Sequence, residues 1–218
     1  MIAALLAACL MNGDLSDLPV REFPVASPSS RFAVLLTGDG GWRRIDDQIA
    51  SRLREANIPV AGFLTPDYYR NERQPEEAAC ALERVIRAYS ARWHRDRVIV
   101  IGYSRGADVL PFMLSRLDPA VRSSIDEVAL LGLESSIEFR YHRSWIPFFH
   151  PHEPQFPVLP EVEKLRGMRV VCVHGEEEHD TACPALASWA LVVREKGGHH
   201  FGGDYRGIAD VILRAVPH

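Results

Sequence analysis

The segment Ile99-Val100-Ile101-Gly102-Tyr103-Ser104-Arg105-Gly106-Ala107-Asp108 joins an apolar, β-branched run to a helical pattern through the sequence G-x-S-x-G. A serine at such a strand-to-helix turn is held in a strained backbone conformation, so the residues two before and two after it must be small. Gly102 and Gly106 meet that requirement. The segment therefore predicts a nucleophile elbow, which presents the hydroxyl of Ser104 at the end of a strand.

The composition is that of a soluble globular protein. The chain has 218 residues, of which 47% are hydrophobic and 25% charged, and its formal net charge is -4. This length suffices for one domain with a full core. The mild acidity gives no electrostatic basis for nucleic-acid binding, because the arginines are scattered among carboxylates. We expect residues 32–218 to form a single domain, preceded by an apolar tail and a linker in residues 1–31.

The start of the chain is apolar but too short to span a bilayer. Leu6-Ala7-Ala8-Cys9 resembles a lipobox, in which a lipid is attached to the cysteine, although the basic segment of a signal peptide does not precede it. Two interpretations stay open. The segment is either the remnant of an export signal, with Cys9 as a lipid anchor, or a plain apolar tail.

Short apolar runs alternate with helical patterns from Phe32 onward, which is typical of a mostly parallel sheet with helices on both faces. The predicted strands are residues 32–37, 58–64, 97–102, 127–133, 168–174 and 189–194, with a further edge strand near 20–25. The predicted helices are residues 45–57, 105–117 and 205–215, and one that begins at Pro75 and includes Trp93.

Residues 134–160 break this alternation, because they are rich in aromatic residues and proline and too long for an ordinary connection. They follow the strand after the nucleophile helix, so they should lie above the carboxyl ends of the strands, where open α/β sheets bind ligands. We expect a cap over an apolar substrate, with contacts from Trp145 and Phe148. The alternative is a loop that packs on itself.

A serine nucleophile needs an imidazole to take its proton and an acid to orient that imidazole. In enzymes with this elbow, the acid follows the serine and precedes the histidine in the chain. Residues 175–184, directly after the predicted strand 168–174, contain four carboxylates. We prefer Asp180, because a proline stands four residues after it. Glu178 is the alternative, because it stands three residues after the glycine that opens the segment.

The histidine is expected after the last strand, in the glycine-rich segment 196–205. His199 fits an H-x-F pattern with Phe201 and is preferred over its neighbour His200. Glycines on both sides allow this loop to carry an imidazole toward Ser104.

The tetrahedral intermediate of such a reaction needs two backbone donors. We expect one from the N–H of Arg105 and the other from Asp39 or Gly40, in the glycine-rich loop 37–42. That loop lacks a P-loop lysine and G-x-G-x-x-G, so a nucleotide is not expected. No metal is expected either, because His142, His150 and His152 have no Cys or carboxylates at matching positions. We expect no cofactor. The substrate contacts expected outside the cap are Asp39, Trp42 and Tyr103.

Cys172 and Cys183 bracket the segment that carries the candidate acids. In an oxidising compartment a disulfide between them would brace this segment. The alternative is two buried thiols.

Four segments together resemble the bacterial virulence protein VirJ family, which also forms the C-terminal domain of AcvB proteins. They are GDGGW at 38–42, GYSRGADVLP at 102–111, GEEEHDTACP at 175–184 and GGHHFGGDY at 197–205. The resemblance implies an α/β-hydrolase fold and export to the periplasm. It also implies a link to type IV secretion and the hydrolysis of aminoacylated phosphatidylglycerol, notably the lysyl form.

We therefore expect an α/β-hydrolase fold of about six to seven strands and a periplasmic serine hydrolase acting on an ester, with Ser104, His199 and Asp180 as its triad. An aminoacyl phospholipid would bring the protein to a membrane surface, and its ammonium would need an acidic partner such as Asp39 or one of Glu176–Glu178. Two alternatives remain. One is a non-catalytic periplasmic partner of secretion components or their cargo, and the other is an intracellular hydrolase of small esters.

Overall fold

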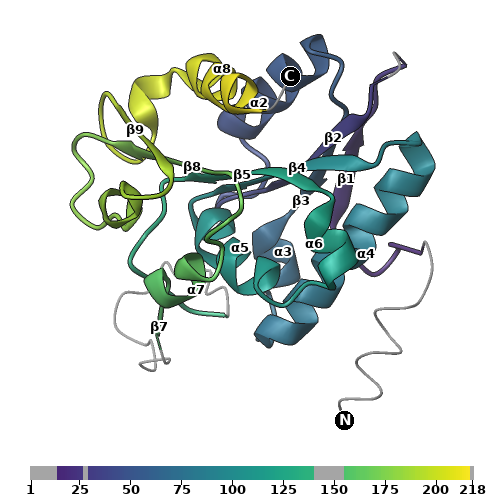
Figure 1. The fold of residues 1–218 in the computed structure, drawn as a ribbon, viewed down its shortest axis with the longest axis horizontal. Coiled ribbons are helices and arrows are strands. Elements are labelled where there is room, and N and C mark those ends of the chain that lie inside the picture. The colour runs from purple at the N-terminus through teal and green to yellow at the C-terminus, as the bar shows by residue number, and fades with distance from the viewer. Residues whose placement is uncertain (1–13, 27–28, 140–154, 217–218) are drawn as a thin grey trace.

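A computed structural model of the chain describes residues 14–26, 29–139 and 155–216. Its centre is a seven-stranded sheet with the strand order β1-β3-β2-β4-β5-β8-β9 (Figure 1). Neighbouring strands are parallel except at the edge, where β1 runs antiparallel to β3. The strands are β1 (Val20–Phe23), β2 (Arg31–Leu36), β3 (Val60–Phe63), β4 (Arg97–Tyr103), β5 (Ile125–Leu131), β8 (Val170–Gly175) and β9 (Leu191–Glu195). All the predicted strands are confirmed.

Helices cover both faces of this sheet, as the fully apolar strands require. One face carries α2 (Arg44–Glu55) and α8 (Tyr205–Ala215), and the other carries α4 (Pro75–Trp93) and α5 (Arg105–Leu114) (Figure 1). Three short helices also pack on the α4 and α5 face, and they are α3 (Thr65–Tyr68), α6 (Pro119–Ser123) and α7 (Leu159–Glu163). None of the helices in the described ranges is long and apolar enough to cross a bilayer.

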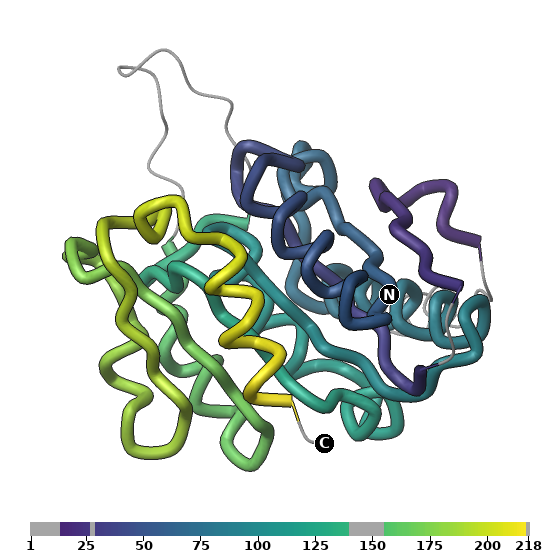
Figure 2. Tube along the Cα trace, turned by 90° about the horizontal axis from the view of Figure 1, so that it is seen from above, coloured from purple at the N-terminus to yellow at the C-terminus, as the bar shows by residue number. Residues whose placement is uncertain are grey.

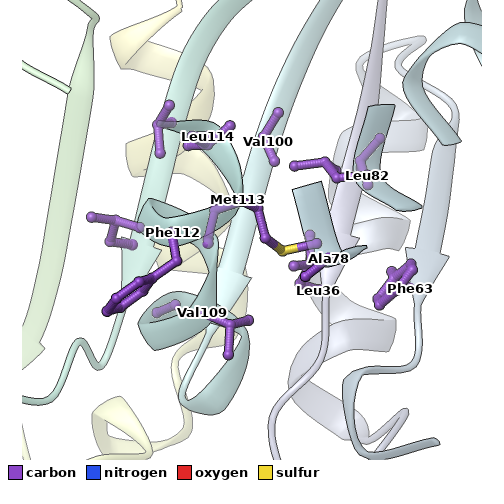
Figure 3. Close-up of a cluster of buried hydrophobic side chains, with 14 of the residues drawn as sticks. Leu36, Phe63, Ala78, Leu82, Val100, Val109, Phe112, Met113 and Leu114 are labelled. Atoms are coloured by element: carbon purple, nitrogen blue, oxygen red, sulfur yellow. The ribbon is translucent and has the colours of Figure 1, made fainter. Parts of the chain in front are cut away.

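Apolar side chains pack helix α5 against the sheet and against its neighbour α4. Val109 and Met113 of α5 are fully buried and lie in one cluster with Val100 of β4 and Leu82 of α4 (Figure 3). Complete burial of a side chain of this size stabilises the fold by about 1.5–3 kcal/mol. This packing holds the start of α5, and with it the turn that contains Ser104.

On the opposite face, α2 and α8 lie side by side (Figure 2). An ion pair joins Arg52 Nε to Asp210 Oδ1 at 2.7 Å. The loop before each helix leaves the carboxyl end of a strand, so this pairing of helices brings the loop 37–43 and the loop 196–204 to the same edge of the sheet.

The ends of the 134–160 segment form a small sheet in which β6 (Ser136–Ile137) runs antiparallel to β7 (Phe156–Pro157). Phe139 is buried there, with its ring centroid 5.0 Å from that of Phe112 and 5.1 Å from that of Phe156. The base of the segment is therefore attached to α5. Trp145 and Phe148 lie outside the described residues, so their contacts stay a prediction.

Candidate active site

Ser104 lies at the turn between β4 and α5 in a backbone conformation that few residues adopt. Its φ is 54° and its ψ is -126°. Neighbouring backbone holds the turn, because the N–H of Ser104 donates to the carbonyl of Leu131 at 2.8 Å and the N–H of Ala107 donates to the carbonyl of Ser104 at 2.7 Å. Strain of this kind persists only where the surrounding structure imposes it. The predicted strained strand-to-helix turn is therefore present, and the role of Ser104 as a nucleophile stays a prediction.

The two glycines of the elbow allow a close approach of backbone to backbone. A Cβ on Gly102 would lie 2.4 Å from the carbonyl oxygen of Gly106, and a Cβ on Gly106 would lie 2.3 Å from that of Leu36. Both distances are far below van der Waals contact. A side chain at either position would push α5 away from the sheet and move Ser104.

His199 is hydrogen-bonded to a buried carboxylate. Its Nδ1 lies 2.6 Å from Oε1 of Glu178, whose side chain is 7% exposed. The second carboxylate oxygen, Oε2, accepts the N–H of Gly175. A carboxylate only accepts hydrogen bonds, so Nδ1 of His199 carries the hydrogen and Nε2 is left as the basic nitrogen.

Electrostatics strengthens this pair. Burial disfavours the charged form of Glu178, but the hydrogen bonds from His199 and Gly175 outweigh it and lower the pKa of the carboxyl group. The hydrogen bond to Glu178 raises the pKa of His199, and burial opposes it. The pair therefore stabilises an imidazolium, which is the form that a general base reaches during catalysis.

Asp180, the preferred acid of the sequence analysis, does not contact His199. Its side chain is exposed, and Oδ1 accepts the N–H of Ser135 at 3.3 Å. The turn after β8 is the reason, because the N–H of Glu178 donates to the carbonyl of Gly175 and folds Glu178 back under the histidine loop. The structure thus brings the alternative acid, Glu178, to the imidazole.

Two glycines let the histidine loop approach the strand ends. A Cβ on Gly132, where φ is +65°, would lie 2.7 Å from Cε1 of His199. A Cβ on Gly175 would lie 2.3 Å from the carbonyl oxygen of Gly198. The imidazole is therefore held against backbone on one side and Glu178 on another.

Ser104 and His199 line the same cavity, whose volume is about 320 Å³. No direct hydrogen bond joins these two described side chains, and catalytic hydrogen bonds often tighten only when substrate binds. The lining residues are Gly38, Asp39, Gly40, Gly41, Arg43, Arg44, Ile45, Tyr103, Ser104, His199, His200 and Tyr205. Arg43, Arg44 and Tyr205 are site residues that were not predicted from the sequence, although two adjacent arginines directly after a glycine-rich loop are a recognisable pattern.

The loop after β2 lies against Ser104, where an oxyanion loop is expected. A Cβ on Gly38 would be 3.1 Å from Cβ of Ser104, and Asp39 and Gly40 line the cavity. The N–H of Arg105 follows Ser104 directly in the chain. The expected donors are thus gathered around Ser104, and their role in binding an oxyanion stays a prediction.

The carboxylate of Asp39 is already paired. It accepts from Nε of Arg105, and Nη1 of Arg105 donates to the carbonyl of Glu138 at 2.7 Å. This arrangement ties the oxyanion loop to the base of the 134–160 segment. A second carboxyl group, that of Glu134, is half-buried and interacts electrostatically with His199, and burial raises its pKa.

Of two further predicted substrate contacts, Tyr103 is among the described residues that line the cavity and Trp42 is not. Trp42 is absent from the described lining of the cavity, because its ring stacks on Phe23 at a centroid distance of 4.5 Å and covers Gly62. Tyr103 does line the cavity. Its hydroxyl lies 2.6 Å from Nδ1 of His200 and donates to the carbonyl of His199 at 3.3 Å, so it also supports the histidine loop.

A disulfide joins Cys172 of β8 to Cys183, which begins the short 3-10 helix Cys183–Leu186. Both cysteines are fully buried. The bond closes the loop that carries Glu178. The predicted bracing of this loop is therefore present in the structure.

Comparison with solved structures places this arrangement in a known fold. The chain is similar to Est1E from Butyrivibrio proteoclasticus, with 11% identity, a TM-score of 0.58 and coverage of 94% of this chain and 98% of that chain. An α/β hydrolase from Novosphingobium aromaticivorans gives 13% identity, a TM-score of 0.56 and coverage of 94% and 100%. A proline iminopeptidase from Mycobacterium smegmatis gives 11% identity, a TM-score of 0.59 and coverage of 90% of this chain and 94% of that chain. Identities this low show the fold alone.

The family comparison is more specific. No curated protein matches the chain significantly. The family model described as bacterial virulence protein (VirJ) matches residues 30–218, which include the elbow, the Glu178 loop and the histidine loop. The chain therefore belongs to the VirJ family of bacterial virulence proteins and has the α/β-hydrolase fold.

Proposed function

We propose that the protein is a serine hydrolase that cleaves an ester. The observation that carries this proposal is the meeting, in one cavity, of a serine in a strained elbow with an imidazole that is hydrogen-bonded to a buried carboxylate. Ser104 is the nucleophile, His199 the general base and acid, and Glu178 the group that orients His199.

The reaction follows from the positions of these groups. Nε2 of His199 takes the proton of the Ser104 hydroxyl as Oγ attacks the ester carbonyl. The N–H groups of Arg105 and of Asp39 or Gly40 stabilise the oxyanion. The intermediate collapses to an acyl-serine, and His199 gives its proton to the departing alcohol. Water then attacks the acyl-serine while His199 takes its proton, and His199 returns that proton to Oγ of Ser104 as the acid is released.

For the substrate, we propose an aminoacylated phospholipid such as lysyl-phosphatidylglycerol at the periplasmic face of a membrane. Membership of the VirJ family supports this class, and the Cys172–Cys183 disulfide agrees with an oxidising compartment.

Purified protein and vesicles test this function directly. Vesicles of phosphatidylglycerol that contain lysyl-phosphatidylglycerol are incubated with the wild-type protein or with Ser104→Ala, and the released lysine is measured. We expect release by the wild type and none above background by the variant. Absence of release from these vesicles, together with turnover of short esters, would reject the lipid substrate. Absence of both would favour a non-catalytic binding role.

A further inference from the structure

The cavity beside Ser104 is cationic on the side of α2. Arg43 and Arg44 line it together with Ser104 and His199. Asp39 is the one carboxylate among the described lining residues, and it is paired with Arg105. The two arginines therefore give this side of the cavity a positive charge that its own lining does not balance.

The two carboxylates that follow these arginines in the chain accept hydrogen bonds from groups other than the two guanidiniums. Asp46 accepts the backbone N–H of Arg43 at 2.8 Å, and Asp47 accepts the indole N–H of Trp42. Burial raises the pKa of Asp46 to about 7, so this group is a weak counter-charge near neutral pH. Among the residues that the structure describes, neither guanidinium group forms an ion pair.

Positive charges at these two positions destabilise helix α2. They occupy the N-cap and first position of α2, where a positive charge opposes the helix dipole. Arg43 is also held close to the oxyanion loop, because a Cβ on Gly40 would lie 2.9 Å from its Nε. An anion in the cavity would offset this destabilisation and would sit beside the reacting ester.

Resting on the proposed hydrolase function, we propose that Arg43 and Arg44 form a subsite for a phosphate group on the alcohol side of the substrate ester. A guanidinium group can form two parallel hydrogen bonds to phosphate oxygens, and a phosphate has more oxygens than a carboxylate to offer to two arginines. The cavity volume of about 320 Å³ has room for a glycerol phosphate. The subsite would thus select esters of a phosphate-bearing alcohol.

Two matched esters test the subsite, namely the acetyl ester of glycerol 3-phosphate and glycerol monoacetate. We expect Arg43→Gln/Arg44→Gln to lower the ratio of kcat/KM for the phosphate ester to that for the neutral ester by at least about tenfold, mainly through KM. Arg54→Gln is the control for charge on α2, because it removes one positive charge from an exposed position on the same helix, outside the cavity. We expect this control to leave the ratio unchanged.

A binding measurement separates this inference from the hydrolase proposal. Glycerol 3-phosphate is titrated calorimetrically into Ser104→Ala protein with the native arginines and into the same protein carrying the two arginine substitutions. Binding that needs the arginines and is not reproduced by glycerol or acetate supports the subsite even where turnover fails. A ratio unchanged by the double substitution, with the wild type hydrolysing both esters, would overturn the subsite and leave the hydrolase proposal standing.

Discussion

Replacing Glu178 by Gln should nearly abolish ester hydrolysis. The carboxylate is buried and lies 2.6 Å from Nδ1 of His199, where it fixes the hydrogen on Nδ1 and stabilises the imidazolium. An amide can donate to Nδ1 instead and favour the tautomer whose Nε2 cannot accept a proton. The loss in kcat is expected to reach about 10³–10⁴, and a loss of 10⁴ corresponds to about 5.5 kcal/mol of transition-state stabilisation.

The assay is kcat for p-nitrophenyl butyrate, with Asp180→Asn as the matched control. Asp180 accepts only the N–H of Ser135 among its described contacts, and an Asn oxygen preserves that bond, so we expect a change of less than about threefold. Unfolding midpoints of both variants show whether the fold is retained. A severe loss in Asp180→Asn with a mild effect of Glu178→Gln would refute the assignment of the acid.

The pH profile provides a second measurement on the same variant. A general base must be neutral, so kcat/KM rises as pH passes upward through the pKa of His199. The hydrogen bond to Glu178 raises that pKa, and its loss should lower it. Residual activity of Glu178→Gln should therefore begin its rise at a lower pH than the wild type. A shift to higher pH would contradict the proposed pairing.

Three further predictions concern the stability of the fold. Gly106→Ala should lower the free energy of unfolding by about 3 kcal/mol or prevent folding, because its Cβ would lie 2.3 Å from the carbonyl oxygen of Leu36; denaturant titration measures this, and a neutral effect would contradict the close approach. Cys172→Ser/Cys183→Ser should cost about 3 kcal/mol, because the bond closes a loop with a sequence separation of 11, and an unchanged midpoint would deny the disulfide. Burial without a hydrogen-bond partner raises the pKa of Glu127 to about 8, above its value in the unfolded chain. The folded state therefore holds the extra proton, and the free energy of unfolding of the wild type should fall as pH rises from about 4.5 to 8. Glu127→Gln should lack this fall, and parallel pH profiles of the two proteins would contradict the prediction.

The sequence predicted the strands and the elbow because both depend on local requirements. Val98–Ile101 is an uninterrupted apolar run of the kind that only a doubly covered strand buries. Gly102 is required by a backbone approach within the motif itself, whereas Gly106 is required by the approach of Leu36 from β2. His199 was also predictable, because it follows the last strand and the flanking glycines allow its loop to approach the ends of the other strands.

The choice of acid and the place of Trp42 depended on turns and on contacts distant in sequence. Four carboxylates follow β8, and the backbone turn at Gly175 decides which one reaches His199, a geometry that spacing to a proline does not encode.

Trp42 was expected in the cavity because of its neighbours in the chain. Gly62 indicates the actual position of Trp42, because a glycine inside a strand often marks the close approach of another group, here the Trp42 ring.

The central claim is that Ser104 is a nucleophile activated by His199. Its most direct test is covalent labelling by a fluorophosphonate probe, followed by peptide mass mapping of the wild type, Ser104→Ala and His199→Ala. The account predicts one adduct on the peptide containing Ser104 in the wild type, no adduct in Ser104→Ala and strongly slowed labelling in His199→Ala. Labelling of Ser104→Ala at the wild-type rate, or an adduct on another serine, would contradict it.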